Sequence, residues 1–135
     1  MAGGPVDCIV DDVAAIIARL PMTLRAKHYT TDKVAGEVLD SESRMSLEFM
    51  LESGLIEVVE DPGTGLDLGA ALSRRLSEAD KSLLRLAASL RGRCKSIAVA
   101  TDDYSLQEAA ARLGFKVITV RYRGARSVRG GRVLP

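Results

Sequence analysis

Short apolar runs alternate with stretches of helical spacing along this chain. Residues 6–10 form a β-branched apolar run, which predicts a strand. The apolar positions of residues 13–20 then recur at helical spacing, and Pro21 closes the predicted helix. Further apolar runs predict strands at residues 55–59, 96–100 and 115–120, and helical patterns predict helices at residues 77–91 and 106–113. The chain therefore reads repeatedly as strand, helix, strand.

The segments on either side of the second predicted strand have weaker signals for secondary structure. Thr30 or Thr31 can cap a helix that reaches about Leu39, and the apolar residues of 47–51 indicate another helix that ends near Gly54. Residues 61–63, Asp-Pro-Gly, predict a turn, and residues 65–76 are only moderately helical. Because parallel strands need crossover helices that cover both faces of a sheet, the whole pattern predicts an α/β fold. We expect a central parallel sheet of four or five strands flanked by helices, with the functional crevice at its carboxyl edge.

Composition narrows the class of protein. The chain has 135 residues, 47% of them hydrophobic and 27% charged, which fits one globular domain. Its two cysteines, Cys8 and Cys94, are too few and too scattered for a disulfide framework or a zinc ribbon, so a cytoplasmic location is expected. Cys8 lies in an apolar strand and is expected in the core. No apolar stretch approaches the length of a membrane helix, so no membrane partner is expected.

Positive charge is concentrated after Val120. Without that segment, 14 basic residues face 18 acidic ones, so residues 1–120 form an acidic domain and residues 121–135 a basic tail. Such a tail suits a polyanion, although a solvated end that only aids solubility has the same composition. The tail arginines are Arg121, Arg123, Arg126, Arg129 and Arg132, and the first four are the candidate RNA-binding residues.

Acidic residues recur at the predicted carboxyl edge. Asp11 and Asp12 directly follow the first strand, and Asp102 and Asp103 follow the strand at residues 96–100. Two more acids, Asp80 and Glu37, lie beside the apolar stripes of their helices, where an isolated charge would be costly. Such carboxylates must be hydrogen-bonded, paired or bound to a metal.

Each acid also has a purely structural interpretation. Ser77 and Asp80 fit a capping box, and Asp102 or Asp103 can cap the helix that follows. Asp12 can interact with a helix dipole, and Glu37 can pair with Lys33 on an exposed face. Taken together, these roles leave unexplained why acids recur at both strand ends and on two apolar stripes, so the pattern favours a metal site.

The order of these acids resembles the PIN domains. That family carries an acid after the first strand, a second on an early helix, a third at a helix start and a fourth after a later strand, and Asp11, Glu37, Asp80 and Asp103 match these positions. The chain looks most like the archaeal PIN endonucleases of small-subunit ribosomal RNA maturation. The segments that carry this likeness are residues 29–31 with Val34 and residues 37–38, residues 76–80, and residues 101–107.

The resemblance implies a three-layer PIN-like fold and a metal-dependent endoribonuclease. Asp11, Glu37, Asp80 and Asp103 would hold Mg²⁺ or Mn²⁺, which suits all-oxygen ligation, with Thr101, Asp102 and Asp12 in support. The metal would activate a water for attack on a phosphodiester of single-stranded RNA, expected to be a ribosomal RNA precursor. His28 could act as a base, but a lone histidine beside Tyr29 at a strand start is more often a surface or hydrogen-bonded residue.

Three departures from the pattern bear on the substrate. Asp12 stands where these domains usually carry Thr or Ser, Glu108 replaces the usual Asn after Gln107, and the chain has no Cys-x-x-Cys pair for the zinc ribbon of the ribosomal RNA enzymes. Two other readings therefore stay open: a VapC-type toxin with an antitoxin partner, and a catalytically silent module that binds RNA or a protein. A homodimer is compatible with each reading.

Overall fold

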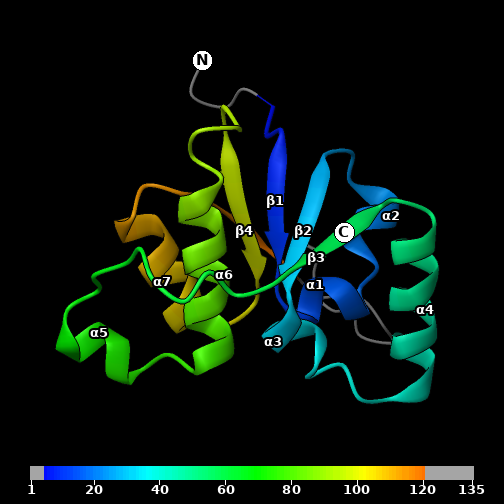
Figure 1. Ribbon diagram of the computed structural model, residues 1–135, viewed down its shortest axis with the longest axis horizontal. Helices are drawn as coiled ribbons and strands as arrows, with labels where there is room; N and C mark the ends of the chain where they lie inside the picture. Colours follow the sequence, from blue (N-terminus) through cyan, green and yellow to red (C-terminus); the bar gives the residue numbers. More distant parts are fainter. Residues whose placement is uncertain (1–4, 121–135) are drawn as a thin grey trace, which may run out of the picture.

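The computed structural model describes residues 5–120 and contains one sheet of five parallel strands (Figure 1). The strands lie in the order β3-β2-β1-β4-β5. Their bounds are Cys8–Asp11 for β1, Lys27–Thr31 for β2, Ile56–Val59 for β3, Ile97–Thr101 for β4 and Lys116–Thr119 for β5. The α/β fold with a central parallel sheet is thus confirmed, with β1 in the middle.

Seven helices connect the strands in this part of the chain. They are α1 Val13–Ile17, α2 Leu20–Thr23, α3 Asp32–Ala35, α4 Ser41–Glu52, α5 Ala70–Arg74, α6 Glu78–Ser89 and α7 Tyr104–Arg112. The two strongest helical patterns correspond to α6 and α7, and Gly114 ends the latter with φ of 90°, a conformation that suits glycine. In the described residues, no helix is long and apolar enough to cross a membrane.

Local structure departs from prediction around Pro21. Instead of one helix closed by this proline, α1 ends near Ala18, and α2 begins at Leu20 with Pro21 in its first turn. A first-turn proline costs no hydrogen bond, because the helix leaves those N–H groups unpaired anyway. The break lies at Arg19, whose φ of 59° is left-handed and cannot continue a helix.

The apolar runs predicted four strands, and β2 is not one of them. Its sequence, Lys-His-Tyr-Thr-Thr, is polar, yet His28, Thr30 and Thr31 are buried. Hydrogen bonds from their side chains, rather than apolar character, satisfy these positions inside the sheet. The strand fills the place between β1 and β3 and makes the sheet five-stranded.

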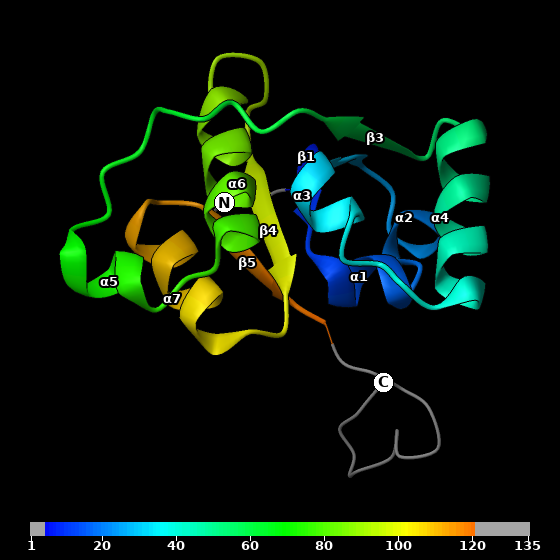
Figure 2. The same cartoon turned by 60° about the horizontal axis from the view of Figure 1, so that its bottom comes forward.

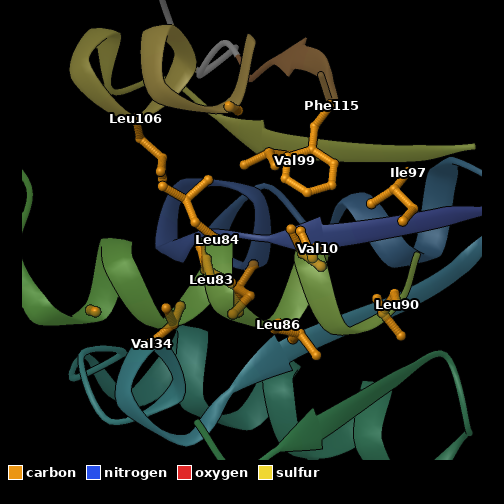
Figure 3. Packing of buried hydrophobic residues seen from close by; sticks show 14 of the residues in the cluster. Val10, Val34, Leu83, Leu84, Leu86, Leu90, Ile97, Val99, Leu106 and Phe115 are labelled. Atoms are coloured by element: carbon orange, nitrogen blue, oxygen red, sulfur yellow. The ribbon is translucent and has the colours of Figure 1, made fainter. Parts of the chain in front are cut away.

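Helices cover both faces of the sheet, as a three-layer fold requires. On one face, the leucines of α6 extend toward Val10 of β1 and Val99 of β4 (Figure 3). On the other face, Ala15 of α1 packs with Ile9 and with Ala98 and Ala100 of β4. The turned view shows α6 and α1 separated by the central strands (Figure 2). Both faces of β1 and β4 are therefore buried.

A disulfide joins Cys8 of β1 to Cys94 in the loop before β4, across 86 positions of sequence. Cys8 is 2% exposed, so its predicted place in the core is confirmed. The bond itself was not expected from two scattered cysteines, because only the sheet brings β1 beside the loop that leads into β4. The cysteine count therefore no longer supports a reducing compartment, and the cytoplasmic location stays a prediction.

Candidate functional site

Asp11 and Asp12 point to opposite faces of the sheet. Along β1, Cys8 and Val10 belong to the core beneath α6, whereas Ile9 belongs to the smaller core beneath α1. Side chains alternate along a strand, so Asp11 shares the face of Ile9 and the next residue returns to the face of α6. Asp12, and not Asp11, is therefore on the same face as α6.

Asp12 is held at the carboxyl edge by Thr101, the last residue of β4. The Thr101 hydroxyl donates a hydrogen bond of 2.6 Å to Asp12 Oδ2 and accepts one of 3.0 Å from the backbone N–H of Asp103. Thr101 is fully buried, so this hydroxyl is a fixed bridge between the two acidic segments. Thr101 therefore orients the carboxylate of Asp12.

Asp80 and Asp103 both cap helices. Asp80 Oδ2 accepts from the backbone N–H of Ser77, while the Ser77 hydroxyl accepts from the N–H of Asp80, both at 3.0 Å. Asp103 Oδ1 accepts from the N–H of Ser105 at 2.9 Å. The predicted capping roles are confirmed, and they orient the two carboxylates: the second oxygen of Asp80 and of Asp103 accepts no hydrogen bond within residues 5–120.

Three carboxylates influence one another at this edge. The pKa of Asp12 is raised, first by burial and then by the negative charges of Asp80 and Asp103. The pKa of Asp80 is raised by burial and by the charge of Asp103. Within the described part of the chain, however, no three His, Cys, Asp or Glu side chains are close enough to hold one ion together. The structure thus gathers Asp12, Asp80 and Asp103 as neighbours, not as a complete ligand shell.

Asp11 is instead part of a buried pair with His28. Its Oδ2 lies 2.6 Å from His28 Nδ1, and both side chains are at most 1% exposed. His28 Nε2 is 2.8 Å from the carbonyl of Leu24, which can only accept, so this nitrogen carries a proton. Asp11 Oδ1 is buried and has no partner in residues 5–120. The hydrogen-bonded reading of His28 is confirmed, and the surface reading is wrong.

The same pair perturbs the protonation of both groups. Burial raises the pKa of Asp11 to about 6, although the hydrogen bond from His28 acts to lower it. Burial alone would lower the pKa of His28, but the hydrogen bond and charge of Asp11 raise it overall. The pair therefore retains a shared proton between Nδ1 and Oδ2 near neutral pH.

Glu37 and Asp102 are exposed acids that follow α3 and β4. Glu37 follows α3 and is exposed, although Val34 and Val38 beside it are buried, so the expectation that a charge at this position would be costly is wrong. Its proposed pairing with Lys33 is also wrong, because Lys33 Nζ binds Asp61 Oδ2 at 2.6 Å. Asp102 is exposed and makes no hydrogen bond within residues 5–120. The structure thus brings Asp12, Asp80 and Asp103 near one another and pairs Asp11 with His28, while the four-acid metal site stays a prediction.

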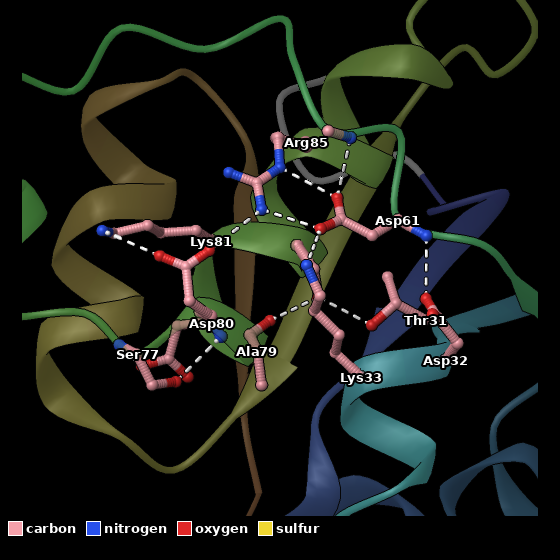
Figure 4. A network of polar contacts seen from close by, with 12 residues as sticks. Thr31, Asp32, Lys33, Asp61, Ser77, Ala79, Asp80, Lys81 and Arg85 are labelled. Carbon is pink, nitrogen blue, oxygen red and sulfur yellow. Dashed lines mark hydrogen bonds and ion pairs between the residues drawn. The ribbon is translucent and has the colours of Figure 1, made fainter.

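Polar residues that the sequence argument missed hold α6 in place (Figure 4). Asp61, in the predicted turn after β3, accepts from Arg85 Nε and Nη2 at 2.9 and 2.8 Å, and these bonds lower its pKa. Nearer the site, the Thr31 hydroxyl is 2.7 Å from that of Ser82, which donates to the Ala79 carbonyl. The only sequence signal for these contacts was the Asp-Pro-Gly turn.

Glu108, the departure on α7, also braces the site. It forms ion pairs with Arg75, just before α6, and with Arg112 on its own helix. The first pair connects the start of α6, which carries Asp80, to α7, which Asp103 caps. The tail arginines, which include the candidate RNA-binding residues Arg121, Arg123, Arg126 and Arg129, lie outside the described residues.

Comparison with known proteins identifies relatives. The chain is 40% identical over 125 residues to "Ribonuclease VapC3" of Aeropyrum pernix, covering 88% of this chain and 90% of the relative. It is 42% identical over 106 residues to "Endoribonuclease Nob1" of Pyrococcus abyssi and 35% identical over 106 residues to that of Methanothermobacter thermautotrophicus.

Coverage differs between these relatives. The match spans 74% of this chain in both Nob1 comparisons, but only 62% and 61% of the Nob1 proteins. No protein-family model matches the chain. The identity and coverage of the VapC3 match, the Nob1 matches and the parallel five-stranded sheet agree with one another. The chain belongs to the PIN-domain ribonucleases.

Proposed function

We propose that this protein is a metal-dependent endoribonuclease that hydrolyses single-stranded RNA at the carboxyl edge of its sheet. The observation that carries the proposal is the neighbourhood of Asp12, Asp80 and Asp103, each held by one carboxylate oxygen. The relatives named as ribonucleases support the reaction class. We assign the first acidic position to Asp12 in place of Asp11.

The donor set fits Mg²⁺ or Mn²⁺. Asp12, Asp80 and Asp103 offer only oxygen, and Asp80 and Asp103 each keep one oxygen that accepts no hydrogen bond within residues 5–120. Mg²⁺ usually keeps several waters and takes only one or two carboxylates directly, so three neighbours without a closed shell suit it. Burial first, and then repulsion between the carboxylates, raises the pKa of Asp12 and Asp80, and a bound cation would offset both.

In this site a bound divalent ion would supply an activated water and stabilise charge on the leaving oxygen. Thr101 keeps Asp12 oriented by its donated hydrogen bond, and the cap at Ser77 does the same for Asp80. Glu37 follows α3, which packs against α6, and we retain it as the acid that orients the attacking water. Asp11 fixes β1 to β2 through His28.

Two biological settings fit this chemistry. We place ribosomal RNA processing first, because the segments at residues 29–31, 76–80 and 101–107 resemble those endonucleases. The toxin setting is favoured by one observation: the VapC3 relative matches over 90% of its length, whereas each Nob1 match spans about three fifths of the relative. Both cysteines of the chain are used in the disulfide, so none is left for a zinc ribbon.

The test is cleavage of single-stranded RNA by the full chain with Mn²⁺, and with EDTA as the blank. We expect Asp12→Asn and Asp103→Asn each to lower the cleavage rate at least a hundredfold, with unchanged circular dichroism spectra. Their matched controls are the sequence neighbours Asp11→Asn and Asp102→Asn. Asp102→Asn should cleave like the wild type, and Asp11→Asn should retain more activity than Asp12→Asn.

If the wild type, Asp12→Asn and Asp103→Asn cleave RNA at equal rates, the proposed metal site is wrong. Full loss in Asp11→Asn with activity kept in Asp12→Asn would return the first acid to Asp11. Absence of cleavage by the wild type, with Mn²⁺ tightly bound, would favour the silent module. To separate the settings, cleavage sites are mapped on precursor ribosomal RNA, and the chain is purified from its own cells. A small stoichiometric protein that blocks cleavage would support the toxin.

A further inference from the structure

Three side chains form a row across the carboxyl edge of the sheet. When the register of β1 with its two neighbours is continued to the strand ends, Asp12 comes level with Thr31 of β2 and Thr101 of β4. Each lies two positions after a residue of the core beneath α6, so all three side chains point to the face of α6. Neighbouring strands are about 5 Å apart, so Asp12 has a threonine on each side. Thr101 binds Asp12, whereas the Thr31 hydroxyl is directed at α6.

The Thr31 hydroxyl belongs to a buried relay of hydrogen bonds. It accepts from the backbone N–H of Val34 at 3.2 Å, and it lies 2.7 Å from the hydroxyl of Ser82. Ser82 in turn donates its one hydroxyl hydrogen to the carbonyl of Ala79 at 2.6 Å. The hydrogen between the two hydroxyls must therefore come from Thr31, and the direction of the whole relay is fixed. Thr31 and Ser82 are both 0% exposed, so these bonds are shielded from water.

This relay reaches the turn of α6 that carries Asp80. Figure 4 shows Thr31, the last residue of β2, opposite Ala79, which precedes Asp80 in the sequence. The hydrogen bonds between Asp80 and Ser77 orient the Asp80 carboxylate on its own helix. They do not fix where that helix begins relative to the sheet. The relay does, because it joins a residue of the sheet to the first turn of α6.

Other polar contacts of α6 place this turn less directly. Arg85 binds Asp61 after β3, but Arg85 lies more than one helical turn beyond Asp80 and so holds the middle of the helix. The ion pair of Arg75 with Glu108 comes before the helix, and its side chains are 49% and 27% exposed, so water weakens it. The relay is buried and every group in it is bonded, so it is the contact that best resists displacement of the first turn.

The acids of the edge differ in how they are joined to one another. Asp12 and Asp103 are linked through the hydroxyl of Thr101, whereas Asp80 comes from a separate helix. Metal ligands must be held to within about 0.5 Å of their working geometry. We propose that Thr31 and Ser82 are positioning residues of the metal site, whose relay holds Asp80 at the level of Asp12. Both are fully buried and act through α6, and the inference rests on the proposed function for the metal itself.

The first test is titration of Mn²⁺ into the full chain by calorimetry. Ser82→Ala removes the group that receives the Thr31 hydroxyl, and we expect it to weaken Mn²⁺ binding about tenfold. The matched control is Ser89→Ala on the same helix. The Ser89 hydroxyl also donates to the carbonyl three residues earlier, that of Leu86, at 2.7 Å, but in residues 5–120 it does not bond to another element. Ser89→Ala should leave the affinity for Mn²⁺ unchanged.

Two further readouts separate positioning from a general loss of stability. RNA binding in EDTA, followed by fluorescence anisotropy, should be the same in the wild type and in Ser82→Ala, because no metal takes part. Thr31→Val removes the hydroxyl and should weaken Mn²⁺ binding as Ser82→Ala does, whereas Thr31→Ser keeps the hydroxyl and should restore most of the affinity. The double variant Thr31→Val/Ser82→Ala should bind Mn²⁺ no more weakly than the weaker single variant, because both changes break one relay.

Crystal structures of the metal-free protein test the same inference without the metal. Alanine is a good helix former, so Ser82→Ala should fold, and its Asp80 carboxylate should be displaced relative to Asp12. Ser89→Ala should show no displacement. An unmoved Asp80 in Ser82→Ala would overturn the inference, as would equal loss of Mn²⁺ affinity in Ser82→Ala and Ser89→Ala. If the wild type binds no Mn²⁺, the proposed function fails, and the metal-free structures still decide whether the relay positions Asp80.

Discussion

Reduction of the Cys8–Cys94 disulfide should remove much of the stability of the folded chain. The bond joins residues 86 positions apart, so it restricts a long loop in the unfolded state. On the chain-entropy model, a loop of this length corresponds to about 4.5 kcal/mol at 25 °C. Domains of this kind are typically stable by only about 5–15 kcal/mol, so the reduced protein should be marginal.

The perturbation is applied in two ways, by a reductant and by Cys94→Ser. We choose Cys94 because it is partly exposed, whereas a serine at Cys8 would bury a hydroxyl in the core. Urea unfolding is followed by circular dichroism, with and without the reductant, and free thiols are counted under denaturing conditions. We expect the free energy of unfolding to fall by about 3–5 kcal/mol in both cases.

The variant provides the control, because the reductant should leave its unfolding midpoint unchanged. Two free thiols in the purified wild type would show that the bond does not form, and the reasoning would fail at its first step. An intact bond whose loss costs less than about 1 kcal/mol would instead refute the chain-entropy magnitude. The slope of the transition should rise on reduction, since the reduced unfolded chain exposes more surface.

Three further predictions concern buried polar groups. Folding raises the pKa of both Asp11 and His28, so their contribution to stability is present at low pH and is lost as pH rises. Unfolding free energy measured by urea should fall from pH 5 to pH 8, and this fall should be smaller in Asp11→Asn. Arg85→Met removes the two hydrogen bonds of Arg85 to Asp61, which keeps its contact with Lys33, and should cost about 1–3 kcal/mol by the same assay. Thr101→Val removes a donor that orients the acidic edge and should weaken Mn²⁺ binding about 10- to 100-fold by calorimetry.

The parts of the fold that the sequence predicted are those with strong periodicity. Strands β1, β3, β4 and β5 are apolar runs, and α6 and α7 have clear stripes and stop signals. Strand β2 was missed because its buried residues are His and Thr, whose burial depends on partners in β1 and α6. The apolar periodicity of a sequence marks positions that are buried because their side chains are hydrophobic. It does not mark polar side chains that are buried because distant residues satisfy their hydrogen bonds.

The sequence predicted the structural role of those acids that lie at helix starts. Asp80 and Asp103 follow helix-start patterns, so both the caps and the place of the carboxylates were predicted. Glu37 had no such signal, because it lies beyond the end of α3 and is exposed. The contacts of Asp61 and Glu108 join residues 24 and 33 positions apart, respectively, and depend on how α6 is placed.

The choice between Asp11 and Asp12 shows where local patterns fail for a physical reason. A strand with one exposed face alternates polar and apolar residues, and that alternation reveals which way each side chain points. Central strands of a parallel sheet are buried on both faces and read as continuous apolar runs, as Cys8, Ile9 and Val10 of β1 do. Only the neighbours distinguish the faces: His28 on β2 receives one acid and Thr101 on β4 the other. A shift of one residue exchanges the two sides, so the first acid of this site can be assigned only once the partners of β1 are known.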